Sequence, residues 1–268
     1  MLAPSSVVKK TAKTALAPRF LHSVAVCCVI VFAWFVGIFS SFLFSAFTGE
    51  IGFHLMHLAI FIFLLSPLIL GALYYFRRLI WQQEDDVLII FRYFSSLSEY
   101  KRIMRFIGLI SFKFALSALL VFSPCIVIWL LSNETLYEIL GVSLPIWTSN
   151  LWTLNSLVII IAYFLLAFIW LKYYLSAFIF VSNDDIDPSE AITMSTIISK
   201  RTGGDFFGLV ISFIPLILLS VFIAPLLFTL PYFLTSYAVH CRFAITAYNL
   251  DVERFNAASA PSFTADGI

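Results

Sequence analysis

Long apolar runs separated by short polar stretches dominate this chain. The longest uncharged run covers 36 residues, from Phe206 to Cys241. A helix needs about 20 apolar residues to cross a bilayer, where each backbone polar group must find an internal partner. The pattern therefore predicts an all-α fold, a polytopic transmembrane helical bundle. We expect six spans, at about residues 21–47, 51–75, 107–131, 151–174, 206–224 and 226–248.

The spans form one domain, residues 21–250, between two polar tails at 1–20 and 251–268. We expect the C-terminal tail to be disordered. The first run exceeds the apolar stretch of a cleavable signal peptide, so we expect a retained anchor. Thr48-Gly49-Glu50 predicts a turn after it. Three prolines in the last two spans leave a broken or re-entrant pair open as an alternative: Pro215, Pro225 and Pro231.

Composition narrows the choice of solvent and partner. The chain is 62% hydrophobic and 12% charged, and a soluble domain carries about twice that charged fraction. The lipid bilayer is therefore the expected partner. The net charge of +1 gives no basic field, which argues against nucleic acid.

The basic residues indicate an orientation. With six spans, 15 of the 16 Lys and Arg residues lie on the side of the N-terminus, and the sixteenth, Lys113, lies within a span. The opposite side holds Glu50, Glu134 and Glu138. By the positive-inside rule, both termini and both large loops are cytoplasmic.

Two amphipathic helices are expected on the cytoplasmic face. One begins after Asp187, an N-cap followed by Pro188 and by Glu190, which would close a capping box. Gly203-Gly204 would end it. The other amphipathic segment covers residues 87–94.

The two large loops resemble each other. Tyr74-Tyr75 precedes Asp85-Asp86 as Tyr173-Tyr174 precedes Asp184-Asp185, at an offset of 99 residues. Both units would start on the same side of the membrane, so the pattern predicts a parallel internal repeat. Such repeats are common in transporters.

The stretch after Tyr173 resembles a large bacterial family of six-span membrane proteins of unknown function. It shares an Asp-rich turn, a capped helix with a Glu-Ala pair, a Lys and Gly stop, and a Pro-Tyr pair opening the last span. The matching residues are Asp185, Asp187, Glu190-Ala191, Lys200, Gly203 and Pro231-Tyr232. That family is distantly similar to the membrane domain fused to some glycerophosphodiester phosphodiesterases. The resemblance implies a bacterial inner membrane and a fold, but no catalytic residue.

Three polar residues within predicted spans are candidates for function. Apart from the histidines, Lys113 is the only ionisable residue well inside a predicted span, where charge is costly. Either it reaches back to the interface or it serves a substrate or proton. Asn155 would line a cavity in a permease. Arg242 would lie near the headgroups and pair with an acidic residue such as Asp205.

His54 and His57 share a helix face near Glu50 on the outer side. They could bind zinc or sense pH, but interfacial polar residues are the simpler interpretation. The Asp cluster before the capped helix is explained by the helix dipole without a cation. No catalytic residue, cofactor or metal is assigned, and we expect no enzyme.

Two functions remain open. The favoured hypothesis is a non-enzymatic component that organises lipid or recruits partners, including a second copy, through the cytoplasmic helices. It predicts exposed apolar stripes at Met194/Ile198 or Leu88/Phe91. The alternative is a small-molecule permease with a site between the repeat halves, lined by Lys113, Asn155, Ser117 or Tyr237.

Overall fold

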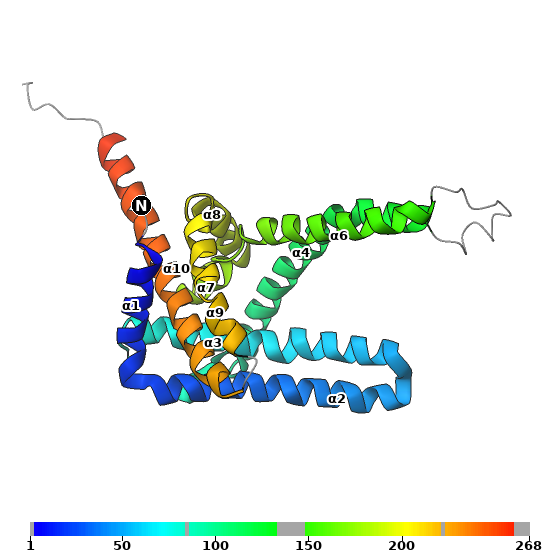
Figure 1. The fold of residues 1–268 in the computed structure, drawn as a ribbon. Helices are drawn as coiled ribbons and strands as arrows, with labels where there is room; N and C mark the ends of the chain where they lie inside the picture. The colour runs from blue at the N-terminus through cyan, green and yellow to red at the C-terminus, as the bar shows by residue number, and fades with distance from the viewer. Residues whose placement is uncertain (1–2, 84–85, 133–147, 221–222, 260–268) are drawn as a thin grey trace, which may run out of the picture.

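All the regular elements of the described residues are helical, which confirms the predicted all-α class. The computed structural model describes residues 3–83, 86–132, 148–220 and 223–259, and no strand forms within these ranges. Two long hairpins project in the same direction from a packed end of the molecule (Figure 1).

Most of the polar N-terminal tail is helical. Helix α1 (Ser5–Leu16) and the short η1 (Ala17–Arg19) lead into α2 (Phe20–Ile60). Gly49 turns α2 back on itself with φ +74, a conformation that glycine adopts without steric cost. The predicted turn at this position is confirmed. Residues 20–80 form the first hairpin.

The returning limb changes its helical geometry near a proline. A π-helical turn, η2 (Phe61–Leu65), precedes α3 (Ser66–Ile80). Pro67 has no N–H to offer the Phe63 carbonyl, and this carbonyl accepts a hydrogen bond of 3.0 Å from the Tyr100 hydroxyl. The hairpin is thereby joined to α4 (Leu97–Leu131).

The second predicted amphipathic segment is a 3-10 helix, η3 (Val87–Phe94), packed on α3. Gly71 allows this contact, because a Cβ there would lie 2.0 Å from the Ile90 carbonyl oxygen. Ile90 and Tyr93 are the buried residues of η3.

The second hairpin consists of α4 (Leu97–Leu131) and α6 (Thr148–Trp170). Two ring contacts fix their antiparallel register, at Phe114–Trp170 (4.8 Å between centroids) and Phe122–Tyr163 (5.1 Å). The loop that carries Glu134 and Glu138 lies outside the described residues.

The capped helix is longer than predicted. After the short α7 (Ser176–Ser182), α8 covers Pro188–Ile211 and continues through Gly203-Gly204. The predicted stop is therefore wrong. The continued helix places the Phe206 ring on the Tyr174 ring, 4.2 Å between centroids and 10° from parallel. This packing outweighs the helix cost of about 1 kcal/mol for each glycine.

The last two predicted spans are not a simple pair of helices. Helix α9 (Ile214–Leu219) follows a break after α8, and α10 covers Ile223–Ser259. Pro215 explains the break, since proline opens a helix but cannot continue one. Helix α10 extends nine residues into the tail expected to be disordered (251–259).

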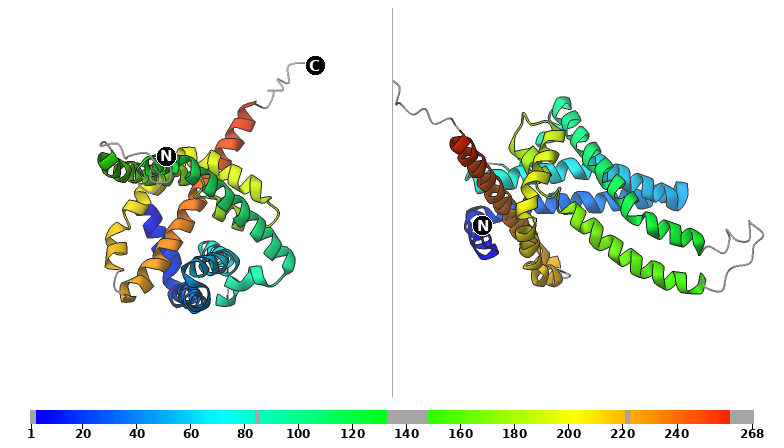
Figure 2. Two further views of the ribbon diagram at one scale, coloured as in Figure 1. Left: turned by 90° about the vertical axis from the view of Figure 1, so that its right-hand side faces the viewer. Right: turned by 90° about the horizontal axis from the view of Figure 1, so that it is seen from above.

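Helix α10 runs crosswise to the first hairpin, as two perpendicular views show (Figures 1 and 2). It packs against α1, α2 and α3. We call the packed end of the molecule, formed by α1, α3, η3, α7, α8 and α10, the base. Its largest fully buried side chains include Tyr75, Phe76, Tyr93, Phe178, Phe180 and Ile192.

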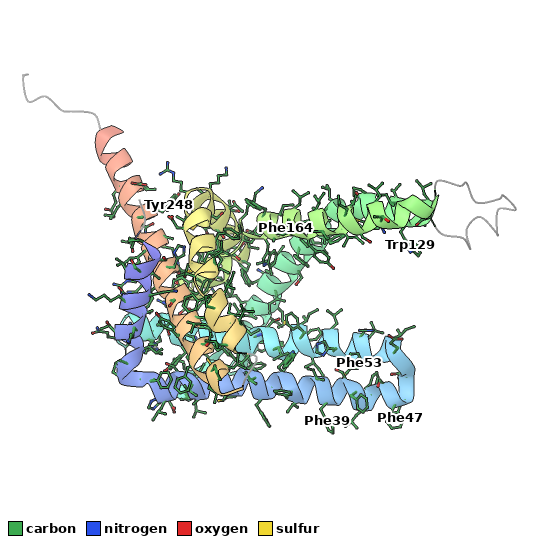
Figure 3. All side chains as sticks on the ribbon, viewed as in Figure 1. Phe39, Phe47, Phe53, Trp129, Phe164 and Tyr248 are labelled. Atoms are coloured by element: carbon green, nitrogen blue, oxygen red, sulfur yellow. The ribbon has the colours of Figure 1, made fainter. Side chains whose placement is uncertain are left out.

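The hairpins are apolar yet exposed outside the base. Phe39 and Phe47 are 62% and 89% exposed and point away from the hairpin (Figure 3). The described residues contain three helical stretches long and apolar enough to cross a membrane, and α10 is not among them. They are Ser5–Ile80, which turns back at Gly49, Leu97–Leu131 and Thr153–Trp170.

Candidate functional site at the base of the hairpins

Basic side chains from other elements neutralise the carbonyl ends of helices in the base. Arg77 donates to the Val181 carbonyl (3.1 Å) at the end of α7. Arg102 donates to the carbonyls of Asn183 (2.8 Å) and Ile186 (3.3 Å) beyond it. Cations are stabilised at helix C-termini, where carbonyls lack helical donors.

The ends of α3 and α8 are neutralised in the same way. Arg242 donates to the Ile80 carbonyl (3.1 Å) and lies 5.1 Å from the Trp81 ring, so the expected pairing with Asp205 is not the contact it makes. Lys9 donates to the Ser212 carbonyl (2.8 Å) at the break after α8. Burial lowers the pKa of Lys9. These basic residues therefore hold the base together.

The acidic motif before α8 orders the entrance of that helix. Asp187 is the N-cap, as predicted, and accepts from the Ser189 backbone N–H at 3.0 Å. Hydrogen bonds from the Ser189 hydroxyl and this N–H lower the Asp187 pKa. Glu190 lies exposed in the first turn, and the Asp185 N–H donates to the Asn183 side chain.

An ion pair joins the two large loops. Arg92 of η3 contacts Asp184 at 2.8 Å, and its guanidinium lies 4.2 Å from the centre of the Tyr74 ring. Asp184 and Tyr74 are both residues of the repeat pattern. The pairing of loop with loop was not apparent from the sequence.

A buried polar network in the base was also missed. The Tyr174 hydroxyl lies 2.8 Å from the Thr202 hydroxyl and 3.0 Å from His240 Nε2, and the Tyr237 hydroxyl donates to the Tyr174 carbonyl. Tyr75, which corresponds to Tyr174 in the proposed repeat, instead lies 3.3 Å from the Ser23 hydroxyl. These partners come from distant elements, so local sequence carries no signal of the network.

Lys113 and Asn155 do not form one site. The Lys113 ammonium lies 5.9 Å from the centre of the Tyr173 ring. We call this position, where the middle of α4 meets the end of α6, the root of the second hairpin. Asn155 is 7% exposed, and its Oδ1 has no hydrogen-bond partner among the described residues. Trp170 packs on Phe114, the residue next to Lys113. Asn155 lies 15 residues before Trp170 in the same helix, which corresponds to about 22 Å, so Asn155 is far from Lys113.

The two histidines lie beside the turn of the first hairpin. His54 Nε2 is 4.0 Å from Glu50, and both side chains are largely exposed. The His57 ring stacks on Phe53 at 5.9 Å. Within the described ranges, no three His, Cys, Asp or Glu side chains gather as metal ligands.

One of the two expected apolar stripes is exposed. Leu88, Phe91 and Phe94 share a face of η3, because a 3-10 helix repeats every three residues, and Leu97 continues the line. Their exposed fractions are 66%, 43%, 38% and 69%. We call these four residues the η3 stripe. The other expected stripe is not available, because Ile198 is buried in the core.

Comparison of the chain with protein-family models, curated proteins and solved structures found no match. The fold and the exposed apolar helices define a helical protein with candidate membrane spans. The family resemblance and the internal repeat stay predictions.

Proposed function

We propose that this chain is an integral protein of a bacterial inner membrane that organises lipid or recruits partners and catalyses no reaction. The observation that carries the proposal is the division between a buried base and exposed apolar hairpins. An exposed surface of Phe and Leu is stable in hydrocarbon and costly in water. The hairpins therefore belong in the bilayer.

The proposed topology has four crossings, two in each hairpin. Both hairpins leave the same side of the base (Figure 1), whose basic residues favour the cytoplasm. Both termini are then cytoplasmic, and the turn at Gly49 is periplasmic. The crosswise course of α10 favours placing α9 and α10 along the interface, in place of the fifth and sixth spans expected from the sequence.

The dispersal of polar residues supports an organiser over a permease. Lys113 lies at the root of the second hairpin, Asn155 lies near its far end, and Tyr237 is committed to the buried network of the base. These residues were expected to line one cavity in a permease. The η3 stripe, in contrast, is an exposed apolar surface where the hairpins leave the base.

The test is isolation of the full chain from native membranes in a polymer that retains surrounding lipid and protein. Replacing two stripe residues, Leu88→Ser with Phe91→Ser, should deplete the co-isolated lipids or partner proteins without lowering the thermal midpoint. The matched control, Leu250→Ser with Val252→Ser, removes exposed apolar side chains elsewhere on the base. Unchanged co-isolation, or saturable solute uptake by the purified protein in vesicles, would contradict the proposal.

A further inference from the structure

We propose that the root of the second hairpin binds the headgroup of an anionic phospholipid, with Lys113 as the main cationic contact. This inference rests on the proposed membrane function and names the lipid class. Lys113 lies on α4, and Trp170, Lys172 and Tyr173 lie at the end of α6 and in the turn after it.

Lys113 carries a charge that the described protein residues leave without an acidic partner. Its side chain is half-buried, and its ammonium faces the Tyr173 ring at 5.9 Å. None of the ion pairs among the described residues includes it. A charge beside hydrocarbon needs a counter-charge or water. A lipid phosphate at the interface supplies that counter-charge.

The turn beside Lys113 is held in a fixed position. The hydroxyls of Ser195 and Ser199, both buried in α8, donate to the Lys172 carbonyl at 3.0 Å each. Lys172 itself is exposed next to Tyr173. A second ammonium is thus available on a backbone that does not have to be ordered when a ligand binds, which lowers the cost of binding.

The aromatic residues mark this position as an interface. Trp170 and Tyr173 contact each other at 6.0 Å between ring centroids, and Trp170 is 40% exposed. Tryptophan and tyrosine concentrate at the headgroup level of membranes. The phosphate of a lipid therefore lies at the same depth as the Lys113 ammonium.

An apolar track beside Lys113 favours a lipid over a free phosphate. Leu116 and Leu120 follow Lys113 by three and seven residues, so all three share a helix face. The two leucines are 55% and 72% exposed. A molecule with a phosphate at one end and acyl chains at the other matches this arrangement of charge and apolar surface.

The test is native mass spectrometry of the full-length protein with phosphatidylglycerol and phosphatidylcholine of identical acyl chains in equal amounts. The wild type should retain more phosphatidylglycerol. Lys113→Gln should lower the ratio of the two bound lipids about fivefold, and Lys113→Arg should preserve it. Lys101→Gln, which removes an exposed charge in the first turns of α4, is the matched control and should leave the ratio unchanged.

A second arm uses Lys172→Gln, which should lower the ratio in the same direction. Equal retention of both lipids by the wild type, or an unchanged ratio in Lys113→Gln, would overturn the site. Displacement of phosphatidylglycerol by excess inorganic phosphate would assign the site to a free anion and would also overturn it. Equal retention of both lipids by a wild-type protein whose hairpin topology is intact refutes this inference alone and leaves the proposed function standing.

Discussion

The Tyr100 hydroxyl of α4 donates a hydrogen bond of 3.0 Å to the Phe63 carbonyl of η2. Pro67 lies four residues after Phe63, where a regular helix would provide an N–H. Tyr100→Phe should therefore lower the free energy of unfolding by about 1 kcal/mol. Thermal or denaturant unfolding in detergent measures the change.

Tyr100→Phe should lower the free energy of unfolding less when residue 67 carries a backbone N–H of its own. In a Pro67→Ala background the Phe63 carbonyl regains an N–H partner, so the effect of Tyr100→Phe should shrink. The two single variants and the double variant form a thermodynamic cycle. Equal effects of Tyr100→Phe in both backgrounds would show that the hydroxyl does not replace the missing donor.

Gly71 sets the distance between α3 and η3. Gly71→Ala places a Cβ against the Ile90 carbonyl oxygen, a backbone atom that cannot rotate away. The variant should lose about 1–3 kcal/mol of stability. Gly108→Ala is the control, because no atom beyond its own turn of helix lies within 4 Å of the added Cβ and alanine favours a helix. The thermal midpoints of the two variants should shift in opposite directions.

The Arg92–Asp184 ion pair joins the loops, but the Asp184 side chain is about half exposed. The coupling free energy of the pair should therefore be below about 1 kcal/mol and should fall with added salt. Arg92→Ala should destabilise more than Asp184→Ala, since it also removes the contact with the Tyr74 ring. Equal losses would mean that the ring contact contributes nothing.

Asp187 makes the stability of the base depend on pH in the acidic range. Hydrogen bonds from Ser189 lower its pKa below the ordinary value of 3.8. The carboxylate thus stabilises the folded state above that value, and this contribution is lost as the pH falls through the lowered pKa. The difference in thermal midpoint between the wild type and Asp187→Ala should be constant above about pH 5 and shrink in stronger acid.

Ser189→Ala provides the control for this pH dependence. It removes the hydroxyl that contributes most to the lowered pKa of Asp187, while the backbone N–H remains. The acid-dependent part of the stability should therefore decrease. An unchanged profile in Ser189→Ala would assign the effect to another group.

Local signals predicted the parts of the fold that depend on near neighbours. The turn at Gly49 and the N-cap at Asp187 follow from residue types that favour those conformations, and both are confirmed. The apolar runs likewise predicted the helices of both hairpins. These features require no knowledge of distant parts of the chain.

Long-range packing decided what the sequence could not predict. Gly203-Gly204 resembles a helix stop, yet α8 continues because Phe206 packs on Tyr174, some 30 residues earlier in the chain. The uncharged run from Phe206 to Cys241 has the length of two short spans, but its course depends on contacts with α1, such as that of Lys9 with the Ser212 carbonyl. No local pattern specifies such contacts.

The placement of the base and hairpins is tested most directly by labelling single cysteines with a membrane-impermeant thiol reagent in intact cells. The variants Glu50→Cys, Ser98→Cys and Ser220→Cys are made in a chain with the four native cysteines replaced: Cys27, Cys28, Cys125 and Cys241. We predict that Glu50→Cys reacts in intact cells, and that the other two react only after permeabilisation. Reaction of Ser98→Cys from outside would contradict a cytoplasmic base, and reaction of Ser220→Cys from outside would restore the two additional spans.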